Sequence, residues 1–147
     1  MIRKYTEHDF EKVIQLMQLN SPRFFDFSEE HDFIHYLTHL KEDYFVVEER
    51  NKVIGAGGIN YCVGKNKEIR FSWDMIHPDY QGKGVGRSLI EYRIDWVKNN
   101  RDEKNVVVRT SQLVYLFYQK FGFKLQTITK NFWAEGLDLY VMHLKLK

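Results

Sequence analysis

Residues that would cross-link the chain or anchor it in a membrane are scarce in this sequence of 147 residues. Its one cysteine, Cys62, cannot form a disulfide within the chain. No apolar run approaches the roughly 20 residues of a membrane span, and the first residues lack the charged and apolar regions of a signal peptide. We therefore expect a cytoplasmic protein.

A dominant charge is also lacking, because 22 Lys and Arg residues face 20 Asp and Glu residues. A chain without a large field of one sign is not expected to bind nucleic acid or an anionic membrane, so any basic site must be local. We find no internal repeat, low-complexity segment or linker. A chain of this length can bury a sizeable core, and we expect one domain over residues 1–147.

Alternating and helical patterns of apolar residues divide the chain into strands and helices. We expect strands near residues 2–5, 44–47, 53–59, 69–76, 106–108, 123–128 and 137–146, and helices near 6–20, 28–40, 85–100 and 111–121. The run at 106–108 is all valine, which is typical of a strand buried on both faces. This order predicts an α/β fold with a mixed sheet and helices on both faces.

Three glycines precede the helix expected at 85–100, in the stretch HPDYQGKGVGRSLIEY. They are Gly82, Gly84 and Gly86, and Lys83 and Arg87 lie beside them. Backbone N–H groups that glycine leaves uncovered, at the positive end of a helix, bind anions, and the two cations favour phosphate or pyrophosphate. The spacing fits neither a P-loop nor a dinucleotide fingerprint. The alternative is a tight strand-to-helix turn, which needs only one glycine.

The segment QGKGVG resembles the Q/R-x-x-G-x-G/A signature of the GNAT superfamily of N-acetyltransferases, and the preceding Ile-His-Pro is similar to that family's usual lead-in. The resemblance extends from IRKYTEHD to YLFYQKFGF, and it implies a mostly antiparallel central sheet with acetyl-CoA as the acyl donor. The residues that it implies for acetyl-CoA binding are Met75 and Ile76 along the pantetheine, Gln81, Gly82, Lys83, Gly84, Val85, Gly86 and Arg87 at the pyrophosphate, and Ser111, where many members carry an asparagine.

Acyl transfer from a thioester to an amine requires loss of the amine's proton and a proton for the departing sulfur. The resemblance implies Tyr118 as the proton donor, although its helical spacing alone would suit a core aromatic. In the strand expected at 69–76, two-residue alternation predicts that Glu68, Arg70, Ser72 and Asp74 share one face. A β-bulge, common beside active sites, would shift which of them points inward. We predict Asp74 as the base, with Glu68 as a second candidate. The alternative is an ion-pair network around Arg70 without chemistry.

The predicted activity is acetyl transfer from acetyl-CoA to a primary amine, by direct transfer in a ternary complex. The acceptor is a small molecule or a peptide, and an apolar pocket for it is expected at Phe24, Phe25 and Phe27, closed by residues 132–136. The alternative is a non-catalytic module that binds or senses CoA.

A zinc hydrolase built on His31 and His35 is less favoured, because Asp replaces the catalytic Glu of that motif, and no metal is expected. Many family members pair, so a homodimer stays open.

Overall fold

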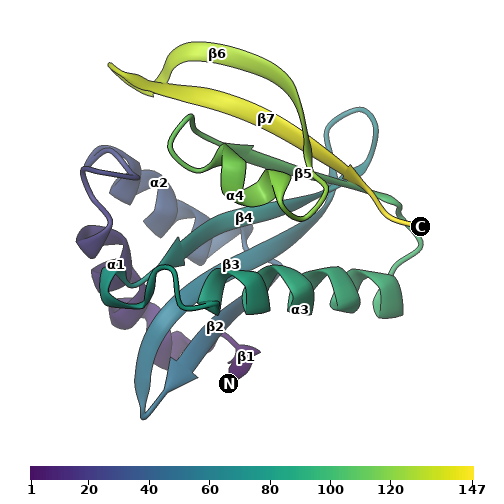
Figure 1. The fold of residues 1–147 in the computed structure, drawn as a ribbon. Helices are drawn as coiled ribbons and strands as arrows, with labels where there is room; N and C mark the ends of the chain where they lie inside the picture. The colour runs from purple at the N-terminus through teal and green to yellow at the C-terminus, as the bar shows by residue number, and fades with distance from the viewer.

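The computed structural model describes residues 1–147, except for the side chains of Cys62 and Val63. The prediction for Cys62 therefore lies outside the described side chains. One sheet has the strand order β1-β2-β3-β4-β5-β7-β6. All its pairs are antiparallel except β4 with β5, as Figure 1 shows. The strands are β1 (Ile2–Lys4), β2 (Asp43–Glu49), β3 (Lys52–Val63), β4 (Glu68–Ile76), β5 (Asn105–Thr110), β6 (Lys124–Ala134) and β7 (Leu137–Lys145).

Helices cover both faces of this sheet, so the predicted fold class is confirmed. The first face carries η1 (Glu7–Asp9), α1 (Phe10–Leu19), α2 (Glu29–His35) and η2 (Tyr36–Leu40), and the second carries α3 (Val85–Asn100) and α4 (Tyr115–Gln119), with η3 (Pro78–Tyr80) before α3. Each face has its own core. Phe33 and Met17 pack on the first face, and Leu89, Ile90 and Phe123 pack on the second.

The helix predicted at 111–121 is shorter in the structure. α4 begins only at Tyr115, and a turn precedes it. The Ser111 hydroxyl accepts a hydrogen bond from the Leu113 N–H at 3.2 Å, which offers the backbone a local alternative to helix. Gly122, with φ of +96°, follows the helix in the left-handed conformation expected of a residue that ends it.

The two central strands pair over a short distance and then separate. In the register of β4 with β5, Ile69 lies opposite Val106 and Phe71 opposite Val108, and the pairing ends there. The second half of β4, up to Ile76, therefore has a free edge on the β5 side. An unpaired strand edge presents N–H and C=O groups that another extended chain can bind.

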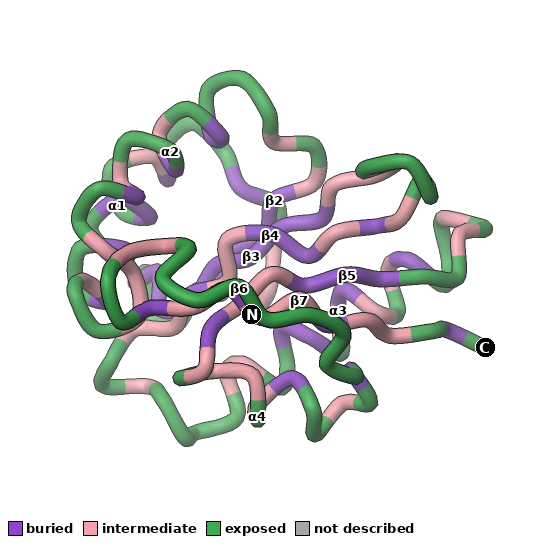
Figure 2. Tube along the Cα trace, turned by 90° about the horizontal axis from the view of Figure 1, so that it is seen from above, coloured by how far each residue is buried: buried purple, intermediate pink, exposed green. Residues whose placement is uncertain are grey.

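Burial is high where β3, β4 and β5 cross the centre of the molecule (purple in Figure 2), and it is least on the outer strand β6 (green). Residues 124–132 of β6 are all exposed. On the free edge of β4, Met75 is buried, whereas Asp74 and Ile76 beside it are partly exposed.

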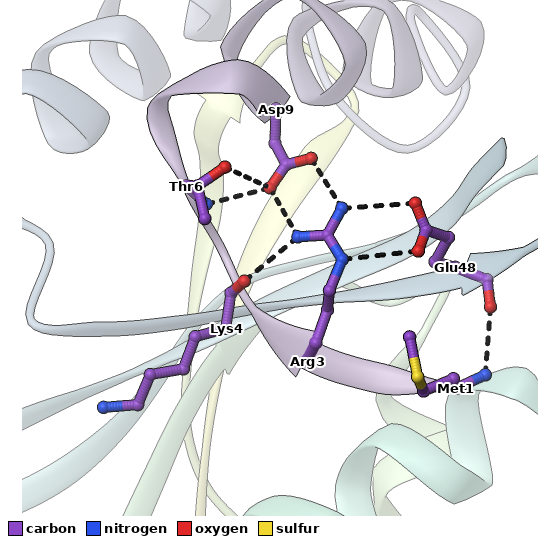
Figure 3. A network of polar contacts seen from close by, with 6 residues as sticks. All are labelled: Met1, Arg3, Lys4, Thr6, Asp9 and Glu48. Atoms are coloured by element: carbon purple, nitrogen blue, oxygen red, sulfur yellow. Dashed lines mark hydrogen bonds and ion pairs between the residues drawn. The ribbon is translucent and has the colours of Figure 1, made fainter. Parts of the chain in front are cut away.

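An ion-pair network fastens the first strand to the first helix (Figure 3). The Arg3 guanidinium donates to both oxygens of Asp9 at 2.8 Å, and it also donates to Glu48 at 3.3 Å. Asp9 additionally accepts from the Thr6 N–H at 2.8 Å. These donors hold the pKa of Asp9 below its usual range, with the Arg3 hydrogen bonds as the largest cause.

We expect Asp9→Asn to lower the free energy of unfolding at pH 7 by about 1–3 kcal/mol, because a buried charged hydrogen bond is lost. A carboxylate with a depressed folded pKa stabilises the protein above its unfolded pKa, near 3.8, and that stabilisation disappears as the pH falls through the folded pKa. The difference between variant and wild type should therefore shrink below pH 4. Urea unfolding at pH 7, 5 and 3 measures it, with the exposed Glu11→Gln as the control.

Candidate active site

A cavity of about 1000 Å³ lies where β4 and β5 separate. Of the residues predicted for acetyl-CoA binding and catalysis, the lining lacks Lys83, Val85 and the second candidate base, Glu68. The Lys83 ammonium lies over the Tyr80 ring at 5.7 Å, and Val85 packs against the core of the second face. The predicted residues that line the cavity are Asp74, Met75, Ile76, Gln81, Gly82, Gly84, Gly86, Arg87, Ser111 and Tyr118.

The glycine-rich loop has the backbone shape that the sequence suggested. Gly82 and Gly84 have φ of +76° and +86°, and Gly84 is the N-cap of α3. A Cβ added at either would meet only open space, so the surface of the loop is bare backbone. Gly86 differs, because a Cβ there would lie 2.9 Å from the Phe117 ring. The first N–H groups of α3 have no partner within the helix, and this loop can therefore accept a pyrophosphate.

One buried amide, that of Asn20, connects the end of α1 to this loop. Its Nδ2 donates to the Leu16 carbonyl at 2.8 Å and to the Ile76 carbonyl at 3.1 Å, and its Oδ1 accepts from Gln81 at 3.2 Å. Asn20, which is 3% exposed, is not among the residues predicted for the site. The signal that could have indicated a buried role for Asn20 is a polar residue at the end of an apolar helix stripe.

A β-bulge in β4 decides which way Asp74 points. Ser72 lies opposite Gly58 and Met75 opposite Ala56, so two residues of β4 face only Gly57. Trp73 takes the left-handed conformation there, with φ of +52°. The Tyr44 hydroxyl donates to the Trp73 carbonyl at 2.9 Å and holds it in place.

The expectation that Glu68, Arg70, Ser72 and Asp74 share one face is therefore wrong. Ser72 hydrogen-bonds Asn60 on the first face, where Trp73 also packs, whereas Asp74 turns to the second face and meets α3. The bulge adds one residue to β4, and alternation reverses beyond it. Asp74 therefore faces away from Ser72 because the bulge adds a residue, and not because the sequence pattern changes.

Asp74 lies between Arg93 and Tyr118. Arg93 donates to both Asp74 oxygens, at 2.6 and 2.7 Å, and to the Gly58 carbonyl at 3.0 Å. The Tyr118 hydroxyl donates to Asp74 Oδ2 at 2.6 Å. Arg93 is 0% exposed, and its guanidinium lies 4.4 Å from the Phe71 ring centre. The two predicted catalytic residues thus share a hydrogen bond, and Arg93 is the buried counter-ion of Asp74.

Burial raises the pKa of the Tyr118 phenol well above 10, and the nearby Asp74 charge raises it further. The phenol is therefore protonated at neutral pH and can donate a proton or a hydrogen bond. Arg93 acts in the opposite direction, because its positive charge favours the phenolate. The Arg93 pKa itself is raised, since the charge of Asp74 and its hydrogen bonds outweigh burial.

Sequence reasoning also missed Arg93. Arg93 was not among the predicted site residues, yet Leu89, Arg93 and Val97 repeat at intervals of four residues in α3 and all are buried. A lone cation inside an apolar stripe requires a buried carboxylate, and this signal could have paired it with Asp74. The other candidate base, Glu68, lies 3.1 Å from His143 instead.

Part of the cavity lining is aromatic, and this part is called the acceptor end below. Phe24, Phe25 and Trp133 line it, and Trp133 donates from its indole to the Thr110 carbonyl at 3.1 Å. Phe27 is 66% exposed and is not part of the lining. Glu29 also lines this end, and burial raises its pKa to about 7.

The remaining candidate features are weaker. His31 and His35 are exposed on α2, and among the residues with described side chains no group of three His, Cys, Asp or Glu could hold a metal ion. Within the same described residues, no helix is long and apolar enough to cross a membrane. Ser111 is buried, and its hydroxyl already accepts from Leu113.

The chain is similar to acetyltransferases in both sequence and fold. The family described as "Acetyltransferase (GNAT) domain" matches residues 41–125. A curated N-alpha-acetyltransferase of Saccharolobus solfataricus is 26% identical, covering 96% of this chain and 90% of its own. Ard1 from Thermoplasma volcanium superposes with a TM-score of 0.83 at 17% identity, covering 100% of this chain and 97% of its own. An aminoglycoside 6'-N-acetyltransferase complexed with coenzyme A gives a TM-score of 0.79 at 11% identity, covering 99% and 96%.

Proposed function

Because the chain belongs to the GNAT acetyltransferase family, we propose that it transfers an acetyl group from acetyl-CoA to a primary amine, directly within a ternary complex. The observation that carries this proposal is the single cavity that joins the glycine-rich loop, the free edge of β4 and the Tyr118 hydroxyl. A structural neighbour solved with coenzyme A supports the choice of donor. Acetyl-CoA supplies the reactive thioester.

In this proposal the backbone N–H groups from Gln81 to Arg87 hold the pyrophosphate. Gly82 and Gly84 allow the close approach, because their surroundings are open. The free edge at Met75 and Ile76 pairs with the pantetheine as an added strand would. Arg87, which lies over the Phe121 ring at 5.1 Å, supplies charge at the rim of the cavity.

Tyr118 is the proposed proton donor to the departing sulfur, and Asp74 is the proposed base. Their 2.6 Å hydrogen bond gives the proton a path. Tyr118 releases its proton to the sulfur as the carbon–sulfur bond breaks, and Asp74 passes a proton to the phenolate. That proton comes from the attacking amine, through water, as its nitrogen bonds to the acetyl carbon. The amine's proton thus ends on the thiol, and both side chains return to their starting state.

The acceptor is proposed to be a primary amine on a peptide or a small molecule. A relative named as an N-alpha-acetyltransferase supports a peptide N-terminus, whereas a neighbour named for aminoglycosides supports a small molecule. The aromatic residues Phe24, Phe25 and Trp133 are the proposed walls for this acceptor.

The proposal is tested by titrating the protein with acetyl-CoA in a calorimeter and by following thiol release over a panel of amines. We expect binding, and thiol release with at least one amine. A CoA sensor would bind without releasing thiol with any amine. Absence of binding would overturn both functions.

Substitution of Gly84 tests the loop itself. We expect Gly84→Val to weaken acetyl-CoA binding at least about tenfold, because a branched residue strains the left-handed backbone by about 1–2 kcal/mol and turns the N–H groups away. Gly64→Val is the matched control, since Gly64 has φ of +70°, an equally open surrounding and a place in the β3–β4 loop. The two variants should lose similar stability, and only Gly84→Val should lose affinity in calorimetry. Unchanged affinity would refute the loop as the pyrophosphate site.

A further inference from the structure

Two arginines line the acceptor end of the cavity on the same face of the sheet. In the parallel register of β4 with β5, Arg70 lies opposite Val107. Arg109 follows Val107 by two residues on β5, so it points to the same face as Arg70. Both side chains are half-buried, and both line the cavity. Diagonal neighbours on adjacent strands are within reach of side chains of this length.

Neither guanidinium has an anionic partner in the part of the chain with described side chains. Arg70 Nε is buried and has no hydrogen-bond partner there. The nearby carboxylates are engaged elsewhere. Glu68 lies 3.1 Å from His143, and both oxygens of Asp74 are bound by Arg93.

Arg109 is nevertheless held in place. Its guanidinium lies over the rings of Phe132 and Trp133, at 5.1 and 5.4 Å from their centres. The Thr110 carbonyl fixes Trp133 by accepting from its indole N–H. Stacking leaves the N–H edges of a guanidinium free for a planar anion.

This arrangement is costly without a ligand. Burial lowers the pKa of both arginines, and the charge of Arg109 lowers that of Arg70 further. A half-buried cation without an anionic partner is unfavourable, and two of them together are more so. An anion bound between them would offset this cost and would gain bidentate hydrogen bonds.

We propose that Arg70 and Arg109 bind a carboxylate carried by the acceptor, several bonds away from the amine that is acetylated. The inference rests on the proposed acetyl transfer and names its substrate class. Arg70 lies opposite Asn60 and the bulge places Asp74 opposite Gly57, so three strand positions of about 3.3 Å, or roughly 10 Å, separate them. This separation favours an acidic side chain beside a peptide N-terminus, or a long ω-amino acid, over the carboxylate of an α-amino acid.

The test compares acceptors that differ only in charge. One pair is a pentapeptide amide with glutamate at its second position and the same peptide with glutamine. The other pair is 6-aminohexanoate and its amide. Thiol release from acetyl-CoA gives kcat/KM for each, and calorimetry with CoA-loaded protein gives their affinities. We expect the carboxylate member to be favoured roughly tenfold to a hundredfold in at least one pair. Preference in the first pair identifies a peptide source, and preference in the second identifies a small molecule.

The ratio of kcat/KM for the carboxylate acceptor to kcat/KM for its amide should fall toward one in Arg70→Gln and in Arg109→Gln. Arg50→Gln, in the exposed β2–β3 turn, should keep the wild-type ratio. The melting temperature of Arg70→Gln and of Arg109→Gln should stay constant or rise, because each variant loses a half-buried charge that has no anionic partner among the described side chains. Equal affinity within both pairs, or a preference that survives both substitutions, overturns the inference while leaving acetyl transfer intact. Loss of acetyl-CoA binding and turnover together would instead refute the proposed function.

Discussion

Tyr118→Phe is expected to lower kcat by about 10²- to 10⁴-fold, the range in which a positioned proton donor contributes. The variant loses only the hydroxyl that donates to Asp74 at 2.6 Å. Its ring still packs against Phe117 and Phe123, and Asp74 still has Arg93. Acetyl-CoA affinity should therefore stay within about twofold of the wild type, and stability within about 1 kcal/mol. Steady-state thiol release and calorimetry on the same preparations measure these quantities.

A matched control lies on the same helix. Tyr115 is half-buried, and its ring packs against Tyr140 at 4.8 Å. Tyr115→Phe should leave kcat near the wild-type value. If Tyr118→Phe were as active as Tyr115→Phe, Tyr118 would be a core aromatic and not the proton donor.

Asp74→Ala should lower the free energy of unfolding by about 3–5 kcal/mol, because it leaves the Arg93 charge buried without its carboxylate. For a chain of this size the melting temperature should fall by about 10 °C. Urea denaturation measures the change. The exposed Glu91→Ala removes an ion pair to Arg87 at 3.9 Å and should cost less than about 1 kcal/mol.

Because Asp74 serves the fold as well as the proposed chemistry, its role in catalysis needs a separate variant. Asp74→Leu combined with Arg93→Met replaces the pair by apolar side chains and should recover most of the lost stability. We expect the double variant to fold and to remain slow in acetyl transfer. A stability loss under 1 kcal/mol in Asp74→Ala would mean that the buried pair contributes little.

Local sequence pattern predicted much of this molecule. The order of strands and helices and the bare backbone of the glycine-rich loop before α3 follow from signals within about 20 residues. The turn at Arg50 and Asn51, with φ values of +52° and +63°, lies between the strands predicted at 44–47 and 53–59. Among the residues predicted for acetyl-CoA binding, Lys83 and Val85 lie outside the cavity lining.

What sequence could not supply are the features that arise between distant segments. The bulge at Trp73 depends on its partners Gly57 and Tyr44, and nothing in the strand's own pattern marks it. The separation of β4 from β5 is likewise a property of two strands. The burial of Arg93 was open to prediction from its place among buried positions of the helix. Its role as a counter-ion depends on Asp74, 19 residues away. The cytoplasmic location, the single domain and the homodimer stay predictions.

The bulge in β4 also has a consequence for how this chain can vary. The one extra residue sets the parity of every later position, so removing Trp73 would exchange the two faces of the strand beyond it. Asp74 would then turn toward α2, and Arg93 would be left alone beneath the sheet. Insertions and deletions between Ser72 and Met75 should consequently be tolerated far less than substitutions. The spacing of this segment is a stricter requirement than its composition.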